Sequence, residues 1–219
     1  MELLQAFERL LETEADPFAA LDAAGFLNVL RELPLAEVEP LIRALGRRAV
    51  SDPVTESMAL RAVAQPGREL MAVMAAAEMA GLSERLLEMS IEYANTRAQF
   101  GKPIARFQAI QQQLAVLAEQ VVLTRIAAQA GCAHGLEPPL LAAATAKSVA
   151  STAAPVIAGI AHAVHGAIGI TAEVPLHRYT ARLHALRMSH GSESYWNARL
   201  GAARLNRQDG NSLDFIRSV

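Results

Sequence analysis

Arginine, aromatic and amide side chains gather in one short polar stretch, residues 93–111, which lies between two long apolar segments. Arg97 carries a planar fork of donors that suits phosphate oxygens. Phe100 offers an aromatic face for stacking, and Gln108 offers amide groups that can hydrogen-bond the edge of a heterocycle. Together these side chains are suited to holding a nucleotide. The alternative is structural: polar residues collect at any turn between helices, and Arg97 would then cap carbonyl groups at its own helix end.

Two glycines, Gly166 and Gly169, mark a second stretch that could approach a ligand. They follow a helical pattern rather than a strand, so the stretch does not match the glycine-rich loops that bind phosphate between a strand and a helix. A tight turn beside a ligand and an ordinary helix end are both compatible with this spacing.

Histidines supply the candidates for acid–base or metal chemistry. His162 and His165 have the spacing of a metal-binding pair on a helix, but no nearby acidic residue or cysteine completes the set, so we expect no metal. His190 precedes Ser192 at a break between two helical patterns, where a base could be presented to a substrate. Ser192 equally suits the N-cap of the helix that follows.

Helical periodicity defines the segments that must position these residues. In the first long helix we expect Ile91 on the buried face, and in the third we expect Pro155 to cause a kink or remove one backbone hydrogen bond. No segment of useful length has the pattern of a β-strand. The segments with a helical period cover residues 68–96, 105–130, 140–164, 175–188 and 192–205. The buried face of the second is expected to comprise Ile110, Leu114, Leu117, Val121 and Ile126.

Composition supports an all-α fold. The 219 residues are 52% hydrophobic but only 5% aromatic, which favours close-packed helices over a β-sandwich. Pro66-Gly67 predicts a turn and is the candidate domain boundary. We therefore predict a small helical N-terminal region at residues 1–65, an antiparallel four-helix bundle at residues 66–206 and a tail at residues 207–219.

Charge and cysteine content exclude several classes of partner. The net charge of −2 gives no electrostatic reason to expect nucleic acid or an anionic membrane. The single Cys132 excludes an internal disulfide and a multi-cysteine metal site, and it is compatible with a cytoplasmic protein. The first residues have the pattern of an amphipathic helix rather than a signal peptide. Lys147 interrupts the longest apolar segment, so we expect no membrane span.

These motifs, in this order, resemble the acyl-CoA dehydrogenase family. Its R-x-x-F-G-x-x-I…Q signature is similar to the run TRAQFGKPI at residues 96–104 followed by FQAIQ at residues 107–111. Its G-G-x-G turn is similar to residues 165–171, and its E-G-T stretch is similar to Gly191-Ser192. The resemblance extends over most of the chain and implies the C-terminal four-helix bundle of that family.

The resemblance implies a flavin enzyme. Members of this family use FAD to desaturate an acyl-CoA thioester between its α and β carbons, and a glutamate removes the α proton. They consist of a helical N-terminal domain, a middle β domain and the bundle. By resemblance, the pyrophosphate and adenine end of FAD would meet Arg97, Phe100 and Gln108 across a subunit interface. Gly166 and Ala167 would lie where the glycine turn approaches FAD from the partner subunit.

Departures from the family pattern change the functional expectation. Ser192 matches the threonine near the flavin, but His190 occupies the usual position of the glutamate, and the alternative position falls at about Met71. Ala167 replaces one glycine of the turn, and the chain shows no β-rich middle segment. We therefore expect a non-catalytic subunit that completes the FAD site of a full-length, glutamate-bearing partner in a heterotetramer. The resemblance implies an acyl-CoA substrate and points to a steroid side-chain CoA.

Two other functions stay open from the sequence. The chain could be a structural bundle that stabilises a partner and touches no cofactor. It could also be a self-sufficient homo-oligomer in which His190 acts as the base, since histidine exchanges protons near neutral pH.

Overall fold

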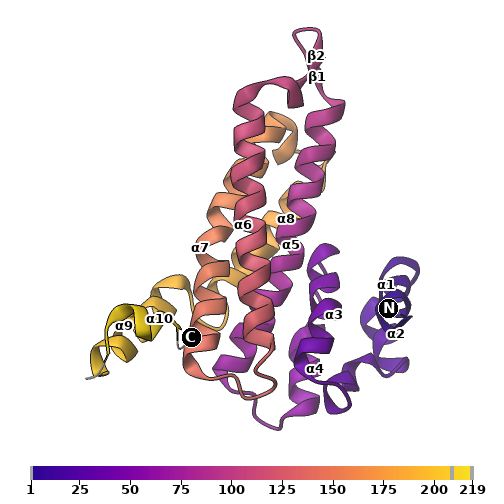
Figure 1. Ribbon diagram of the computed structural model, residues 1–219. Coiled ribbons are helices and arrows are strands. Elements are labelled where there is room, and N and C mark those ends of the chain that lie inside the picture. The colour runs from indigo at the N-terminus through magenta and orange to yellow at the C-terminus, as the bar shows by residue number, and fades with distance from the viewer. Residues whose placement is uncertain (1, 208–209, 218–219) are drawn as a thin grey trace.

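Four helices form an antiparallel bundle in the computed structural model, which describes residues 2–207 and 210–217 (Figure 1). Helix α7 packs against both α5 and α6, while α8 closes the bundle against α5 and α7. A further helix, α9 (Glu193–Asn206), packs on α7. The bundle helices are α5 (Arg68–Thr96), α6 (Gln108–Cys132), α7 (Leu140–His165) and α8 (Leu176–Met188). This arrangement confirms the predicted all-α fold.

Short helices precede the bundle and lie beside its lower half in Figure 1. The second of them begins as its sequence predicts, because the Asp16 carboxylate accepts a hydrogen bond from the Ala19 amide and Pro17 occupies the first helical position. The elements are α1 (Glu2–Thr13), α2 (Pro17–Ala23), the 3-10 helix η1 (Phe26–Arg31), α3 (Leu35–Arg47) and α4 (Val54–Ala62). The boundary proposed at residues 65 and 66 stays a prediction.

The chain after α9 contains one more short helix, α10 (Ser212–Arg217). It falls within the predicted tail at residues 207–219, part of which lies outside the described residues.

Glycines bring α3 and α5 into backbone contact. A Cβ atom on Gly46 would lie 2.0 Å from the Glu78 carbonyl oxygen, and a Cβ atom on Gly81 would lie 1.9 Å from the Arg43 carbonyl oxygen. No side chain larger than hydrogen fits between the two helices at this crossing. The N-terminal helices are therefore anchored to the bundle by close packing.

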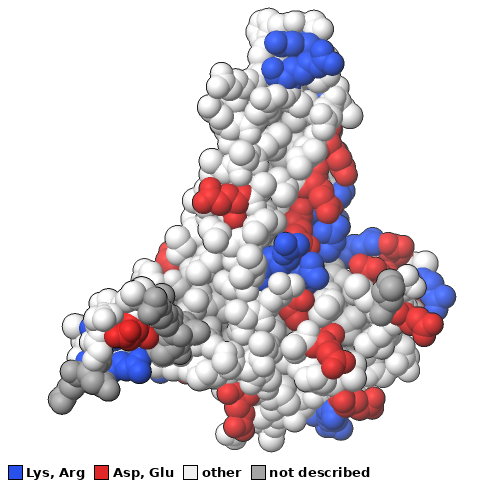
Figure 2. Space-filling view, viewed as in Figure 1, with Lys and Arg blue, Asp and Glu red and all other residues white. Residues whose placement is uncertain are grey.

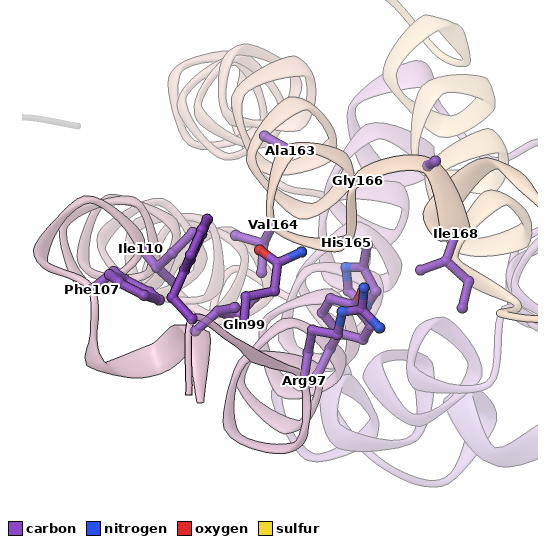
Figure 3. A pocket seen from close by; sticks show the side chains of 13 residues that line it. Arg97, Gln99, Phe107, Ile110, Ala163, Val164, His165, Gly166 and Ile168 are labelled. Atoms are coloured by element: carbon purple, nitrogen blue, oxygen red, sulfur yellow. The ribbon is translucent and has the colours of Figure 1, made fainter. Parts of the chain in front are cut away.

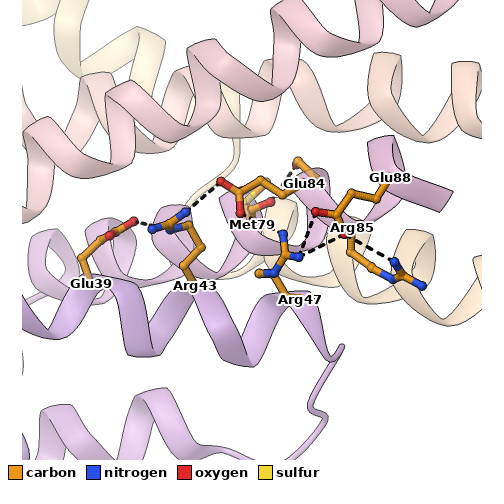
Figure 4. A network of polar contacts seen from close by, with 8 residues as sticks. Glu39, Arg43, Arg47, Met79, Glu84, Arg85 and Glu88 are labelled. Atoms are coloured by element: carbon orange, nitrogen blue, oxygen red, sulfur yellow. Dashed lines mark hydrogen bonds and ion pairs between the residues drawn. The ribbon is translucent and has the colours of Figure 1, made fainter. Parts of the chain in front are cut away.

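Ion pairs extend this contact along the two helices (Figure 4). Arg43 donates to Glu84 over 2.9 Å, and Arg47 donates to Glu84 over 3.3 Å and to Glu88 over 2.8 Å. Because each arginine lies on α3 and each of these glutamates on α5, the network fixes the register of the crossing.

Helix α6 buries a different face from the one we predicted at its C-terminal half. Leu117 and Val121 are buried as expected, but Ile126 is 56% exposed. Thr124 and Ala128 take the buried positions because they follow Val121 by three and seven residues, which keeps them on one side of the helix. Ile110 and Leu114, also predicted on this face, are half-buried. The prediction for Ile91 of α5 was also wrong, since this side chain is 41% exposed.

Apolar side chains on the outer face of α6 consequently point to solvent. Val122, Leu123 and Ile126 are all at least 43% exposed. The surface over α6 in Figure 2 carries few charged side chains. This row of exposed apolar residues on α6 has no covering element within the described part of the chain.

Helix α7 has an unusually apolar composition. With the turn that follows it, the segment Leu140–Ile170 is long and apolar enough to cross a membrane, which corrects our expectation that Lys147 would interrupt it. In this fold the helix lies between α5, α6 and α8, so its alanine-rich surface forms much of the bundle core. It continues through Pro155 from Leu140 to His165.

Candidate functional site

A β-hairpin forms the tip of the bundle between α5 and α6 (Figure 1). Strand β1 (Ala98–Gln99) pairs antiparallel with strand β2 (Lys102–Pro103), a short pairing that the sequence analysis did not anticipate. Phe100 and Gly101 occupy the turn with φ values of 51° and 77°. Positive φ at both central residues is the geometry of a type I′ turn, which favours asparagine and glycine.

Phe100 is therefore an unusual residue at this position. A bulky side chain in the left-handed region carries backbone strain. Its ring is also 91% exposed, so burial within this chain does not offset that strain. The ring makes one edge-to-face contact, with Phe107, at a centroid distance of 6.1 Å. Strain combined with exposure is typical of a residue that serves a binding function.

Below the hairpin lies a cavity of about 650 Å³ (Figure 3). Four predicted site residues meet there, although the two stretches that carry them are far apart in sequence: Arg97 and Phe100 from the hairpin side, and Gly166 and Ala167 from the end of α7. Tyr93, Gln99, Phe107 and His165 also line the cavity. The polar stretch and the glycine turn therefore build one site.

Arg97 provides a cationic group at this cavity. Its side chain is exposed, and no described residue accepts a hydrogen bond or ion pair from its guanidinium. The end of α5 is capped by the Arg97 backbone amide, which donates to the Tyr93 carbonyl oxygen over 2.8 Å. The alternative in which the Arg97 side chain caps its own helix is therefore not supported. A free guanidinium at the cavity wall is available to an anionic ligand.

Aromatic rings form the floor beside Arg97. Tyr93 and His165 stack with ring centroids 4.6 Å apart and an interplanar angle of 22°. His165 is buried, and its Nδ1 lies 2.8 Å from the Ala161 carbonyl oxygen. Burial is the main cause that lowers the pKa of His165, so the ring is neutral at pH 7 with the Nδ1 proton donated to Ala161.

Sequence reasoning missed several of these wall residues. Tyr93 precedes Arg97 by one helical turn, a spacing that could have placed both on one face. For His165 the sequence indicates only half of a pair with metal-like spacing and the start of the glycine turn. Its contact with Tyr93 joins the ends of α5 and α7, and no local pattern reports such a contact.

The glycine turn leaves its backbone open to the cavity. Gly166 begins the 3-10 helix η3 (Gly166–Ile170) with a φ of 63°, and a Cβ atom there would have open space around it. Ala167 follows and is exposed. Conformation rather than crowding therefore requires glycine at position 166, and a ligand can approach the backbone here.

Gln108 lies outside the cavity wall. It is the first residue of α6 and is exposed, whereas Gln99 of the hairpin lines the cavity. The neighbouring Gln111 amide donates to the Ala105 carbonyl oxygen over 2.9 Å. The contact of Gln108 with a cofactor stays a prediction.

His190 and Ser192 occupy a different end of the molecule. Lys147 of α7 contacts the Gly191 carbonyl oxygen, so its position on α7 marks the place of this segment. His165, at the Arg97 cavity, lies 18 residues further along the same helix, a rise of about 27 Å from Lys147 at 1.5 Å per residue. Ser192 holds the N-cap position of α9, but its side chain makes no capping hydrogen bond. The predicted residues therefore divide between two places on one chain.

His190 is held in a half-buried position with a φ of 54°. Burial lowers the pKa of His190, the charges of Lys147 and Arg68 lower it further, and the charge of Glu56 opposes them. A lowered pKa leaves the ring neutral at pH 7, the state in which an imidazole can accept a proton.

Metal chemistry has no support from the described residues. Within 2–207 and 210–217, no group of three or more His, Cys, Asp or Glu side chains could hold a metal ion. His162, half of the pair with metal-like spacing, has its Nε2 3.1 Å from the Thr180 hydroxyl.

The bundle, its glycine turn and the arginine-bearing hairpin define the C-terminal domain of an acyl-CoA dehydrogenase. Residues 61–205 match the family model described as "Acyl-CoA dehydrogenase, C-terminal domain", and the chain belongs to this family of oxidoreductases. Members of the family use FAD. The unpaired Arg97, the exposed Phe100 ring and the open backbone at Gly166 fit the anionic and aromatic parts of such a group.

Individual relatives cover part of the chain. The acyl-CoA dehydrogenase IpdE2 of Mycobacterium tuberculosis is 39% identical over 109 residues, which are 50% of this chain and 33% of that protein. The chain spans about a third of the length of the curated relatives it matches.

Solved structures show the same domain. The ChsE4–ChsE5 complex of Mycobacterium tuberculosis has a TM-score of 0.62 at 30% identity, covering 65% of this chain and 39% of that chain. Butyryl-CoA dehydrogenase of Megasphaera elsdenii has a TM-score of 0.61 at 26% identity, covering 68% of this chain and 38% of that chain.

Proposed function

We propose that this chain is an accessory subunit of an FAD-dependent heteromeric acyl-CoA dehydrogenase and that it completes the FAD site of a partner subunit. The observation that carries the proposal is the unpaired Arg97 beside the strained, exposed ring of Phe100. Both residues are exposed and adjoin strand β1, and the β1–β2 hairpin lies at the tip of the bundle, where a second polypeptide can reach it (Figure 1).

Each residue of this half-site would have a defined task. The guanidinium of Arg97 would bind pyrophosphate oxygens, and the ring of Phe100 would stack against the adenine end. The backbone of the turn at Gly166 would approach the same group without a side chain in the way. FAD, when bound, accepts the hydride in α,β-desaturation of the acyl-CoA thioester.

The proton base would come from the partner subunit. His190 stands where the family pattern has its glutamate, about 27 Å along α7 from the Arg97 cavity. A complete site therefore combines Arg97 of one subunit with a catalytic glutamate of another.

Two further observations support a heteromeric assembly. The row of exposed apolar residues on α6 provides a surface for a partner of similar apolar character. A solved structure that resembles this chain is a complex of two named components, ChsE4 and ChsE5. We infer a heterotetramer with a full-length acyl-CoA dehydrogenase-type subunit, and a steroid side-chain CoA as the candidate substrate.

Co-purification separates this function from the alternatives. The chain is purified alone and after co-expression with candidate partner subunits. The visible absorbance of oxidised flavin is then compared between the two preparations. We expect yellow protein only from the complex. Flavin bound by the chain alone would favour a self-sufficient homo-oligomer. A complex whose flavin content is unchanged in Arg97→Ala and Phe100→Ala would indicate a structural bundle.

A further inference from the structure

One lysine is completely buried in the bundle. Lys147 of α7 has no exposed surface, and its ammonium donates to three oxygens: the Ser151 hydroxyl at 2.9 Å, the Arg187 carbonyl at 2.9 Å and the Gly191 carbonyl at 3.0 Å. The three N–H donors of the compact ammonium group match these three acceptors, whereas the planar guanidinium of an arginine would not. The only other lysine among the chain's 20 basic Lys and Arg residues is Lys102.

The two carbonyl groups flank the connection between α8 and α9. The Arg187 carbonyl lies at the end of α8, and the Gly191 carbonyl precedes the first residue of α9. Because Lys147 holds both, it fixes the short segment between them, which contains His190 and leads to Ser192. We call this segment, residues 188–192, the α8–α9 turn.

The α8–α9 turn is also packed tightly from the side of α9. Gly191 has a φ of 104°, and a Cβ atom there would lie 2.6 Å from the Tyr195 ring and 2.8 Å from Nε1 of Trp196. Trp196 is fully buried. The backbone of the turn is therefore held between aromatic rings and the head of Lys147, so His190 and Ser192 have a fixed direction.

We propose that Lys147 is a positioning residue, which holds the α8–α9 turn and so fixes where His190 and Ser192 lie in the assembled enzyme. This inference rests on the proposed function, because the family resemblance matches Ser192 to a threonine near the flavin. It adds a residue that acts on the site through backbone carbonyl groups and touches neither cofactor nor substrate.

The charges around the lysine are consistent with a positional role. Burial lowers the pKa of Lys147 to about 8, and the neighbouring charges are Glu193, which raises it, and Arg187, which lowers it further. Those two side chains pair with each other. The neutral amine of Lys147 can still donate two hydrogen bonds, one to each carbonyl group, and can accept a hydrogen bond from the Ser151 hydroxyl. The contacts with the turn therefore persist when Lys147 loses its charge.

Hydrogen exchange in the complete chain tests the positioning role without any cofactor. The amides of Ser189 and Trp196, which hydrogen-bond to Ala185 and Ser192, report opening at either side of the turn. In Lys147→Met we expect both amides to exchange at least about tenfold faster, while amides in the middle of α5 keep wild-type rates. Lys102→Met is the matched control and should leave the turn unchanged.

Two results would overturn the assignment. Unchanged exchange in the turn would show that Lys147 does not hold it, and a uniform increase across all helices would show a general role in folding. Should Lys147→Met fail to fold, Ser151→Ala removes one anchor of the ammonium and should raise turn exchange by about threefold. No change in that variant would equally contradict the proposal.

The complex with the partner subunit then tests the consequence for the site. We expect Lys147→Met to retain FAD, because the Arg97 cavity is distant, but to lower kcat at least about tenfold. Loss of flavin and activity in proportion to loss of folded protein would contradict positioning. A wild-type complex without flavin would contradict the proposed function. The exchange experiment needs no flavin, so it would still test whether Lys147 holds the turn.

Discussion

Phe100 shows how a single residue can conflict with its local backbone. Its φ of 51° at the first central position of a type I′ turn favours asparagine. We expect Phe100→Asn to stabilise the hairpin by about 1 kcal/mol, because asparagine tolerates the left-handed conformation and an exposed ring loses little burial. The amide of Ile104, which bonds to the Arg97 carbonyl over 2.8 Å, should then exchange about fivefold more slowly.

The same variant should weaken FAD retention by the complex, since the stacking ring is gone. Phe100→Ala provides the comparison, because it removes the ring without supplying a residue that prefers the turn. Faster exchange of Ile104 in Phe100→Asn would show that the phenylalanine is not strained.

Lys147 gives a pH dependence whose sign follows from its burial. An unfolded chain holds the lysine proton up to a pKa of about 10.4, whereas in the fold the pKa of Lys147 is about 8. Between these values the unfolded state binds more protons, so the contribution of this group to the free energy of unfolding rises with pH. We expect the wild type to gain up to about 3 kcal/mol relative to Lys147→Met between pH 8 and pH 10.4.

Denaturant unfolding of both proteins at several pH values measures this difference. Below pH 8 the difference should be flat. A gain confined to pH values below 8, or a fall above pH 8, would show that the fold does not penalise the charged form of Lys147.

At the scale of elements, the crossing of α3 and α5 depends on two glycines. Gly81→Ala would place a methyl group 1.9 Å from the Arg43 carbonyl oxygen, so the helices must separate. We expect a loss of about 3 kcal/mol in the free energy of unfolding, measured by denaturant titration. Gly159→Ala is the matched control on α7, where a Cβ atom meets open space, and should stabilise the chain by about 0.5–1 kcal/mol. Equal effects of the two substitutions would contradict the crossing.

Helix boundaries could be predicted from the sequence more closely than the faces that helices bury. The predicted helix at 68–96 agrees with α5, because Pro66-Gly67 and Gly101 mark the ends of its periodic pattern. Ile126 was misplaced because periodicity gives the spacing of apolar residues but does not show which neighbours cover them. The outer face of α6 is apolar as well, so its pattern gave no clear phase.

The residues of the candidate site could be singled out from the sequence where they belong to a motif. Contacts between distant elements could not be predicted in this way. Arg97, Phe100, Gly166 and Ala167 line one cavity, although no pattern in the sequence predicts that their two stretches meet, and their contact with a cofactor stays a prediction. The hairpin itself was missed because phenylalanine is not a residue that signals a type I′ turn. The stacking of Tyr93 on His165 depends on the packing of two helix ends, which no local pattern records.

At the scale of the whole molecule, the outer face of α6 should matter only in the assembly. Ile126 is 56% exposed, so Ile126→Glu should leave the unfolding free energy of the isolated chain within about 0.5 kcal/mol. If this face contacts the partner subunit, the same change buries a charge and should weaken association at least about tenfold. Analytical ultracentrifugation of the co-expressed subunits measures the association, with Glu119→Gln on the same helix as a control. Wild-type association in Ile126→Glu would place the interface elsewhere.

The dissociation constant of FAD from the complex tests the proposed half-site most directly. Arg97→Ala should raise it at least about tenfold, because a charge-assisted contact with pyrophosphate is lost. Arg106→Ala, which removes an exposed arginine outside the cavity wall, should change it by less than about twofold. An unchanged dissociation constant in Arg97→Ala would contradict the claim that this chain completes its partner's FAD site.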